Sequence, residues 1–280
     1  MPLSTPFTRY RGETITLAAT VAFATVRGKP HWANYVELEA PSATLEAITV
    51  AFTPKIEKVY FYDASLARGS RWNDLTAALT DRNTGTDTST FLNAMQTGDR
   101  LYVGCRRQFR GLSVDMGGTN AAGTANIVGE YPDQERAWTS LSVTDGTDAT
   151  RTLEQDGLIT WTVPTAGWLK GTLAHVTGLV VDGDDAPVTE GLFWARFRPD
   201  AAITDTSVSI DELVALLNAT VTGVTIDNEG YDVVRIASGN KGPYLFPVHP
   251  EIGGIELVST SITSAALVNW YNLEPSPLRK

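Results

Sequence analysis

The stretch EQDGLITWTVPTAGW, residues 154–168, joins an Asp-Gly turn to an alternating run that carries a first tryptophan and ends on a second. Successive side chains of a β-strand point to opposite faces, so Ile159 and Trp161 share one face. We therefore expect Trp161 to be a core residue. Trp168 follows the break at Pro164 and lies outside the alternation, so we expect it to fold back over a sheet edge, where it could contact a partner.

The same alternation recurs along most of the chain, and turn signals separate the alternating runs. An Asp-Gly pair between two such runs is a strong hairpin signal. These signals fall at Gly117-Gly118, Asp145-Gly146, Asp156-Gly157 and Asp182-Gly183. Strands without interleaved long helices predict an all-β fold, an antiparallel β-sandwich or jelly roll with flanking β segments and at most short helices.

Two segments leave helix and strand open. WNDLTAAL, residues 72–79, is compatible with a short helix or an extended loop. SIDELVALLNA, residues 209–219, begins like a helix because Asp211 and Glu212 follow Ser209, yet the preceding alternation would continue a strand. We expect a short helix or an irregular strand there.

The patterning divides the chain into four segments. Residues 1–64 are expected to form an N-terminal β arm or subdomain, and residues 65–98 a junction loop in which the β signal lapses. Residues 99–218 are expected to form the central β-sandwich. Residues 219–280 would add a C-terminal β segment or a small subdomain.

Composition and charge restrict the classes of partner. The chain has 280 residues, a formal net charge of −10 and a single cysteine, Cys105, so no internal disulfide can form. Without a basic block the acidity argues against nucleic acid and against an anionic membrane surface. Residues 15–26 follow two arginines and could belong to a signal peptide, but Glu13 and the interspersed threonines favour a strand.

Catalytic and metal-binding motifs do not emerge from the sequence. The histidines, His31, His175 and His249, lie in separate segments without the spacing of metal ligands. The acidic runs 145–156 and 182–187 offer oxygen ligands for calcium but do not match its twelve-residue loop, so we expect solvated turns. We therefore predict a protein that is not an enzyme and that has neither a cofactor nor a metal site.

Aromatic and arginine side chains are the remaining candidates for a site. In LFWARFR, Trp194 and Arg196 share a face opposite to that of Phe193, Ala195 and Phe197. Aromatic residues and arginine are enriched in the cores of protein interfaces, although carbohydrate stacking uses the same residue types. The candidate contact residues are Trp168, Trp194, Arg196, Arg106 and Arg107.

The string of elements in residues 99–200 resembles a β-sandwich module of structural proteins in tailed-bacteriophage virions. The resemblance is carried by the runs DRLYVGCRRQFRGLSVDM, NIVGEY, AWTSLSVTDGT, DGLITWTVPTAGW and LFWARFR. The chain departs from the pattern at EYPDQERAW and in a longer acidic loop at 182–190, so the resemblance does not carry a hairpin binding role over to this chain. The shared residues are packing and turn residues rather than catalytic ones.

What this resemblance implies is a structural component of a virion, assembled in the cytoplasm of the host bacterium. The leading expectation is a capsid decoration (cement) protein that binds the major capsid protein and itself, as a homo-oligomer. A tail, baseplate or head-fibre part is the alternative within the virion. A carbohydrate-binding module, with Trp168 and Trp194 as the stacking residues, is the alternative from another class.

Overall fold

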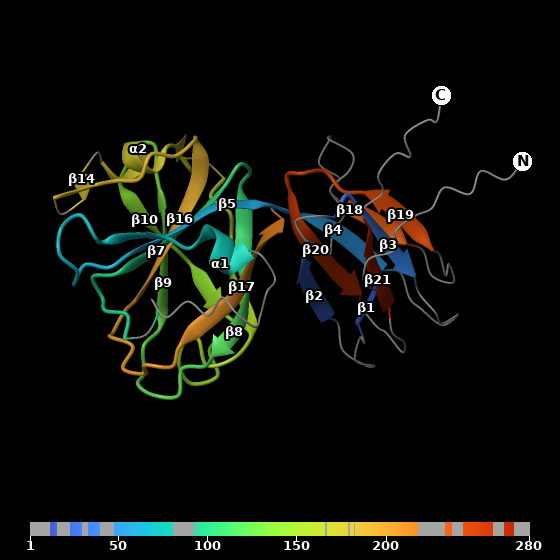
Figure 1. Ribbon diagram of the computed structural model, residues 1–280, viewed down its shortest axis with the longest axis horizontal. Coiled ribbons are helices and arrows are strands. Elements are labelled where there is room, and N and C mark those ends of the chain that lie inside the picture. Colours follow the sequence, from blue (N-terminus) through green and yellow to red (C-terminus); the bar gives the residue numbers. More distant parts are fainter. Residues whose placement is uncertain are drawn as a thin grey trace, which may run out of the picture. The chain divides into compact units, whose positions relative to one another are not determined.

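The protein is built mainly from antiparallel β-strands, as the computed structural model shows (Figure 1). The structure describes residues 12–15, 23–29, 33–39, 48–80, 92, 94–165, 167–178, 180–181, 183–217, 233–236, 243–259 and 266–271. The helices of these residues are short, α1 at Thr76–Thr80 and α2 at Leu173–Thr177. The prediction of an all-β fold with at most short helices is therefore confirmed.

The chain divides into two compact units, and unit 2 interrupts the sequence of unit 1. Unit 1 comprises Met1–Phe52 and Thr220–Lys280, and unit 2 comprises Thr53–Ala219. The first and last segments of the chain thus belong together, which the linear reading of four segments does not anticipate. The boundary after the N-terminal part lies at Phe52 rather than at residue 64, because the strand over Ile56–Tyr62 pairs inside unit 2.

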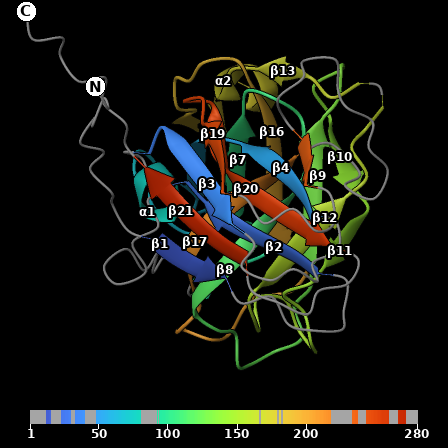
Figure 2. The same ribbon diagram turned by 90° about the vertical axis from the view of Figure 1, so that its right-hand side faces the viewer.

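Unit 1 contains two four-stranded antiparallel sheets, whose strands other than β18 are labelled in Figure 2. One sheet has the order β1-β21-β3-β19 and the other the order β18-β4-β20-β2. Both sheets contribute to one hydrophobic cluster, with Val36 and Trp270 from the first sheet and Phe52 and Ile255 from the second. The strands are β1 Gly12–Ile15, β2 Phe23–Gly28, β3 Tyr35–Glu39, β4 Ile48–Pro54, β18 Val233–Ile236, β19 Tyr244–Pro247, β20 Ile252–Ser259 and β21 Ala266–Tyr271.

Unit 2 also contains two main sheets. A seven-stranded sheet has the order β10-β9-β16-β7-β5-β6, with β13 paired to β16, and a four-stranded sheet has the order β11-β12-β8-β17. A separate hairpin joins β14 to β15. The strands are β5 Ile56–Tyr62, β6 Trp72–Asp74, β7 Arg100–Cys105, β8 Phe109–Gly118, β9 Ile127–Pro132, β10 Trp138–Leu141, β11 Val143–Asp145, β12 Gly157–Trp161, β13 Lys170–Gly171, β14 Val180–Val181, β15 Asp184–Asp185, β16 Leu192–Pro199 and β17 Ser209–Leu217.

The main core of unit 2 contains side chains from both sheets. Phe61 and Phe197 come from the seven-stranded sheet, and Leu112 and Trp161 from the four-stranded one. The alternation of β12 places Ile159 and Trp161 together in this core, so the prediction for Trp161 is confirmed. Close-packed aromatic and aliphatic side chains here supply the main stabilisation of the unit, because burying each large side chain contributes about 1.5–3 kcal/mol.

Two segments that the sequence left open form parts of unit 2. Residues 72–80 contain strand β6 followed by helix α1, so the expected junction loop holds paired structure. Strand β17 covers residues 209–217 and shifts its register against β8 at several points. The irregular-strand alternative is the one observed.

The Asp156-Gly157 pair closes a long loop instead of forming a tight hairpin turn. Strands β11 and β12 pair with each other, and residues 146–156 connect them. At the neck of the loop a Cβ atom on Gly157 would overlap the carbonyl of Gly146. Glycine is required there because the two backbones approach so closely.

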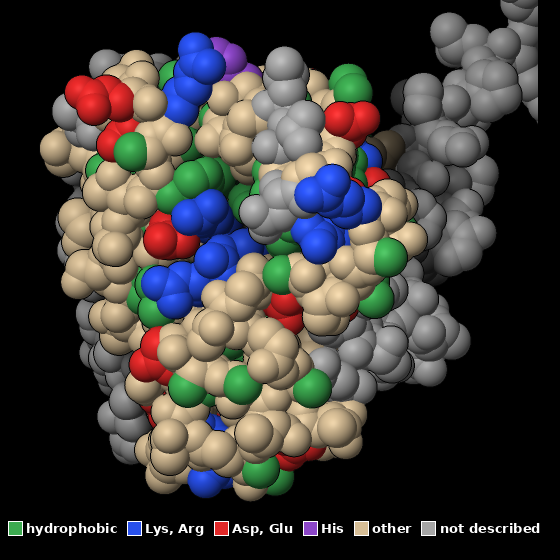
Figure 3. All heavy atoms as spheres, turned by 90° about the vertical axis from the view of Figure 1, so that its left-hand side faces the viewer, with side chains coloured by type: hydrophobic (Ala, Val, Ile, Leu, Met, Phe, Trp, Pro, Cys, Tyr) green, Lys and Arg blue, Asp and Glu red, His purple; other side chains and the backbone are tan. Residues whose placement is uncertain are grey.

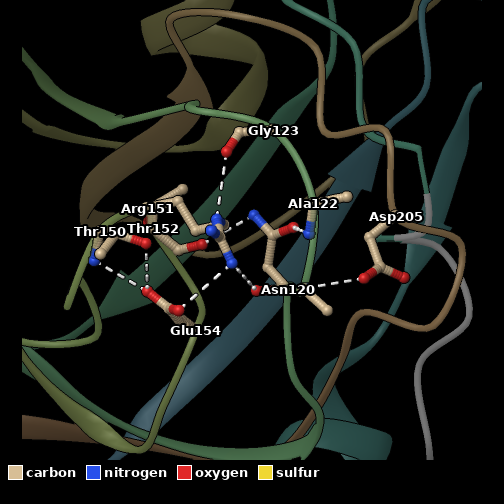
Figure 4. A network of polar contacts seen from close by, with 9 residues as sticks. Asn120, Ala122, Gly123, Thr150, Arg151, Thr152, Glu154 and Asp205 are labelled. Carbon is tan, nitrogen blue, oxygen red and sulfur yellow. Dashed lines mark hydrogen bonds and ion pairs between the residues drawn. The ribbon is translucent and has the colours of Figure 1, made fainter.

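A polar network holds this loop against the segment 119–125 (Figure 4). The side-chain nitrogen Nδ2 of Asn120 donates a hydrogen bond to the carbonyl of Thr152 at 3.0 Å. Arg151 donates to the carbonyl of Gly123 and to the carboxylate of Glu154, at 3.1 and 3.2 Å. Buried polar groups are tolerated when they are hydrogen-bonded, and this network supplies partners for backbone carbonyls that lie outside the sheets.

Substitution of Gly111 by alanine should destabilise unit 2. An added Cβ would lie 2.5 Å from the backbone carbonyl oxygen of Ile159, and backbone cannot move aside as a side chain can. We expect a loss of about 1–3 kcal/mol in the free energy of unfolding, measured by chemical denaturation. Gly191→Ala is the matched control, because no atom lies within 4 Å of its added Cβ. Equal stability of the two variants would contradict the packing described here.

Asp211 should make stability depend on pH. Burial raises the pKa of its carboxyl, the charge of Asp156 raises it further, and its Oδ1 has no hydrogen-bond partner among the described residues. Because the pKa of Asp211 is raised in the folded state, its carboxyl does not lower the stability of the fold below the unfolded-state pKa near 4. Stability is lost as the pH rises through the folded-state pKa, since the buried carboxyl must then ionise. Asp211→Asn should therefore stabilise the protein at pH 7, on the order of 1 kcal/mol.

The measurement is chemical denaturation of both proteins at several pH values. The advantage of the asparagine variant should shrink toward pH 3, where the wild-type carboxyl is protonated in both states. A variant that is less stable than the wild type at pH 7 would show that the charged form is stabilised in the fold.

Candidate functional site: the aromatic and arginine face of unit 2

Both faces of the seven-stranded sheet of unit 2 carry buried side chains. One face packs against the main core, through Ala195 and Phe197 of β16 with Phe193 beside them. The opposite face, called the outer face below, carries Trp194 and Arg196 of the same strand. The predicted alternation of LFWARFR is therefore confirmed, and both of its faces are occupied.

Aromatic rings form a connected row on the outer face. The Tyr102 ring lies 5.6 Å from that of Trp138 and 5.3 Å from that of Trp72, between ring centroids. Trp72 in turn lies 4.9 Å from Tyr62. Trp72 and Trp138 belong to the edge strands β6 and β10 and are half-buried, whereas the tyrosines are buried. The row therefore presents aromatic surface to solvent mainly through Trp72 and Trp138.

Trp194 is not a contact residue, contrary to the prediction. Its side chain has 0% of its surface exposed, and its Nε1–H donates to the carbonyl of Gly171 at 2.9 Å. Leu173 and Val176 of helix α2 belong to the same hydrophobic cluster. The indole is buried because the helix supplies apolar contacts while the strand before it accepts the N–H hydrogen bond.

Trp168 is not exposed at a sheet edge either. Only 4% of its surface is accessible, and its ring lies 5.4 Å from that of Phe109 in the main core. Its Nε1–H donates to the carbonyl of Trp194 at 3.0 Å. The proline break does release this residue from the strand, but the indole then turns inward, because its apolar ring and its N–H both find partners there.

Three arginines gather on the outer face around one carboxylate. The Arg196 guanidinium lies 4.1 Å from the ring centroid of Trp138 and its Nε lies 2.8 Å from Glu130 Oε2. The Nε of Arg198 is 4.0 Å from the same oxygen. Arg100 donates to the backbone carbonyls of Thr97 and Asp99. We call Arg100, Arg196 and Arg198 the arginine cluster.

Strand register accounts for this grouping. Arg196 pairs with Glu130 on β9 and with Tyr102 on β7, so the three side chains lie in one row across the sheet. Arg198 lies two residues further along β16 and therefore on the same face. Arg100 lies two residues before Tyr102 and pairs with Tyr62 on β5.

The electrostatics of the cluster reflect crowding of positive charge. Burial lowers the pKa of Arg100, and the neighbouring charges of Arg196 and Arg198 lower it further. Burial raises the pKa of the Tyr102 hydroxyl, while Arg196 acts in the opposite direction. Arginine nevertheless stays protonated in proteins, so the cluster remains cationic.

Basic side chains are visible around a hollow in Figure 3, which faces the side of unit 2 where α2, β10 and β14 lie in Figure 1. Low-dielectric walls strengthen the field of charges placed in such a hollow. Basic side chains thus gather on this side of unit 2 although the whole chain is acidic.

Arg106 and Arg107 lie in the turn after β7 and do not join the cluster. Both side chains are exposed. Arg106 forms ion pairs with Glu57 and Glu190, at 3.2 and 3.1 Å. Of the predicted contact residues, only Arg196 thus belongs to the arginine cluster.

Sequence reasoning missed Arg198, Arg100, Trp138 and Trp72. The period of two along β16 could have added Arg198 to Arg196. The other three come from strands far away in the chain, and only the register joins them to β16. The sequence alone does not reveal that register.

The described residues also bear on the expectations for metal ligands, for the cysteine and for the acidic run 145–156. They contain no group of three or more His, Cys, Asp or Glu side chains that could hold a metal ion. The Cys105 thiol is buried, and burial raises its pKa well above the ordinary value. In the run 145–156, Asp145 accepts hydrogen bonds from Thr147, and Glu154 pairs with Arg151.

None of the helices in the described part of the chain is long and apolar enough to span a membrane. Comparison of the chain with protein-family models, with curated proteins and with solved structures gives no match.

Replacement of Arg196 by methionine should weaken the fold more than replacement of Arg106. The Arg196 and Glu130 side chains are 18% and 12% exposed, so the change leaves a largely buried carboxylate with only the distant Arg198 and removes the contact with Trp138. We expect a loss of about 1–2 kcal/mol in the free energy of unfolding, measured by chemical denaturation.

Arg106→Met is the matched control. Its side chain is 46% exposed, and exposed ion pairs contribute little, so we expect a change within about 0.5 kcal/mol. Equal losses in the two variants would contradict a special role of the Trp138–Arg196–Glu130 contact.

Proposed function

We propose that the chain is a non-enzymatic structural protein of a tailed-bacteriophage virion, acting as a capsid decoration protein that binds the major capsid protein and itself. The proposal rests on three observations of different kinds. They are the strand order of unit 1, the nature of the motifs in unit 2, and the chemistry of the outer face.

The strand order of unit 1 carries the proposal. Numbered consecutively within this unit, its eight strands have the orders 1-8-3-6 and 5-4-7-2 in the two sheets. This order favours a jelly roll, a two-sheet fold with two Greek keys that occurs in viral capsid domains and in lectins. Unit 2 enters between the fourth and fifth of these strands, so a whole domain occupies the place of one loop.

The motifs that resemble the virion module coincide with strands of unit 2. DRLYVGC contains β7, FRGLSVDM lies in β8, and LFWARFR lies in β16. Their apolar members fill the two hydrophobic clusters of the unit. The resemblance therefore follows the packing framework of the domain, as expected for a structural module that is reused with different surfaces.

The outer face supports contact with another protein. Arginine and aromatic residues are the types that dominate binding energy at protein interfaces. A rigid sheet also presents them without the entropic cost of ordering a loop. A tail, baseplate or head-fibre part would need the same properties, so the position within the particle separates these alternatives from decoration.

Lectins share the jelly-roll order, which keeps carbohydrate binding as the second candidate. The residues first expected to stack on a sugar, Trp168 and Trp194, are buried. Stacking would instead have to use the half-buried Trp72 or Trp138. Binding on a glycan array that is lost in Trp138→Ala, while the fold is retained, would favour this candidate over a virion role.

The decisive prediction concerns purified particles. In a lysate of cells that produce the phage encoding this chain, the protein should co-migrate with virions through a density gradient. Quantitative mass spectrometry should give a constant ratio to the major capsid protein across the peak. Heads separated from tails should keep that ratio.

Two outcomes would overturn parts of this proposal. Recovery with the tails alone would replace decoration by the tail alternative. Complete absence from washed particles would remove the virion role itself.

A further inference from the structure

The arginine cluster is poorly neutralised by its own chain. Arg196 pairs closely with Glu130, and Arg198 reaches the same oxygen only at 4.0 Å. Arg100 is held by neutral carbonyl groups. Among the described residues, Glu130 is the one carboxylate that forms ion pairs with these three guanidinium groups, in a chain whose formal net charge is −10.

The surroundings make this excess charge costly in the isolated protein. The Arg196 and Arg198 side chains are 18% and 28% exposed, so water screens their repulsion only in part. Burial and the two neighbouring charges lower the pKa of Arg100, which shows that the repulsion reaches it. An added anion would relieve the repulsion and gain charge-assisted hydrogen bonds, which are about twice as strong as neutral ones.

The spacing of the cluster suits an extended chain of carboxylates. Arg196 and Arg198 are two residues apart on one strand, and a strand rises about 3.3 Å per residue, so their backbones repeat every ~7 Å. Alternate residues of an extended acidic segment have the same repeat. Glu130 already shows the geometry that such a carboxylate would adopt, because it binds the Nε of Arg196.

The aromatic row adds a second requirement for the occupant. Trp138 covers Arg196, and its ring is half-buried at the edge of the sheet. The aliphatic part of a glutamate side chain can lie against such a ring while its carboxylate reaches the arginines. Aromatic surface beside arginine therefore favours a peptide over a bare inorganic anion.

We propose that the arginine cluster binds an extended acidic segment of a neighbouring protein, with Arg198 and Arg100 as the groups that the partner's carboxylates neutralise. This inference rests on the proposed function only for the identity of that neighbour as a virion protein. The binding chemistry belongs to the outer face itself.

The test uses the full chain and hexaglutamate as the probe, with isothermal titration calorimetry at 50 mM salt. Arg198→Gln should weaken binding about tenfold, since it removes one charge-assisted contact and leaves the Arg196–Glu130 pair in place. Arg107→Gln is the matched control, because this exposed arginine lies in the turn after β7, and binding should be unchanged.

A second variant should change affinity in the opposite direction. Glu130→Gln removes the internal carboxylate that competes for Arg196 and Arg198, so hexaglutamate should bind several-fold more tightly. Damage to the fold would weaken binding in both variants and could not produce this opposite pair. Raising the salt to 300 mM should weaken binding to all the proteins, because ion pairs at a surface are screened.

Three results would overturn the inference. The first is equal affinity of the wild type and Arg198→Gln for hexaglutamate. The second is weaker binding of hexaglutamate by Glu130→Gln than by the wild type. The third is that a heparin hexasaccharide, or an oligonucleotide of the same charge as hexaglutamate, binds more tightly than hexaglutamate does. The last result would assign the surface to an anionic glycan or a nucleic acid. Loss of peptide binding would leave the particle-association test unaffected, so the two proposals fail separately.

Discussion

Burial of strand β16 on both faces is the constraint on which the rest of unit 2 depends. Ala195 and Phe197 belong to the main core, and Trp194 belongs to the cluster on the opposite face. The carbonyl of Trp194 also accepts the hydrogen bond of Trp168, which ties the segment after β12 to the central strand. Strand β16 thus determines the packing on both faces of its sheet, because the apolar side chains of each face must be buried against another element.

This arrangement also decides which groups remain available for contact. The large apolar side chains of the central strands are consumed in packing, so exposed aromatic surface is left to the edge strands β6 and β10. Arginine can occupy a central strand because its stem packs against neighbours while its guanidinium stays at the surface. Arg196 follows this rule, since it lies against Trp138 and pairs with Glu130.

The sequence predicted features that depend on local periodicity. Alternation identified the all-β class, the core position of Trp161 and the two faces of LFWARFR. It could not place Trp168, because the direction of an indole after a proline break depends on which cavity and which carbonyl lie nearby. Nor could it join the first and last segments into unit 1, since β1 pairs with β21 across almost the whole chain.

The candidate site shows the same division between local and long-range information. Arg196 was identified by its position on an alternating strand, but the partners that give it significance come from β9, β10 and β7. Register sets these neighbours, and register depends on turns and bulges that a single sequence specifies weakly. A cluster that joins several strands is therefore the kind of site that sequence reasoning finds one residue at a time.

Rigidity of the arginine cluster supports the proposal that it is a binding surface. The Arg196 guanidinium already lies against the Trp138 ring, so this side chain has little rotamer entropy left to lose when a ligand binds. Arg100 is similarly fixed by two backbone carbonyls. Binding therefore avoids the entropy cost of ordering flexible surface arginines. On this proposal, the outer face attracts an anionic partner although the net charge of the whole chain repels one.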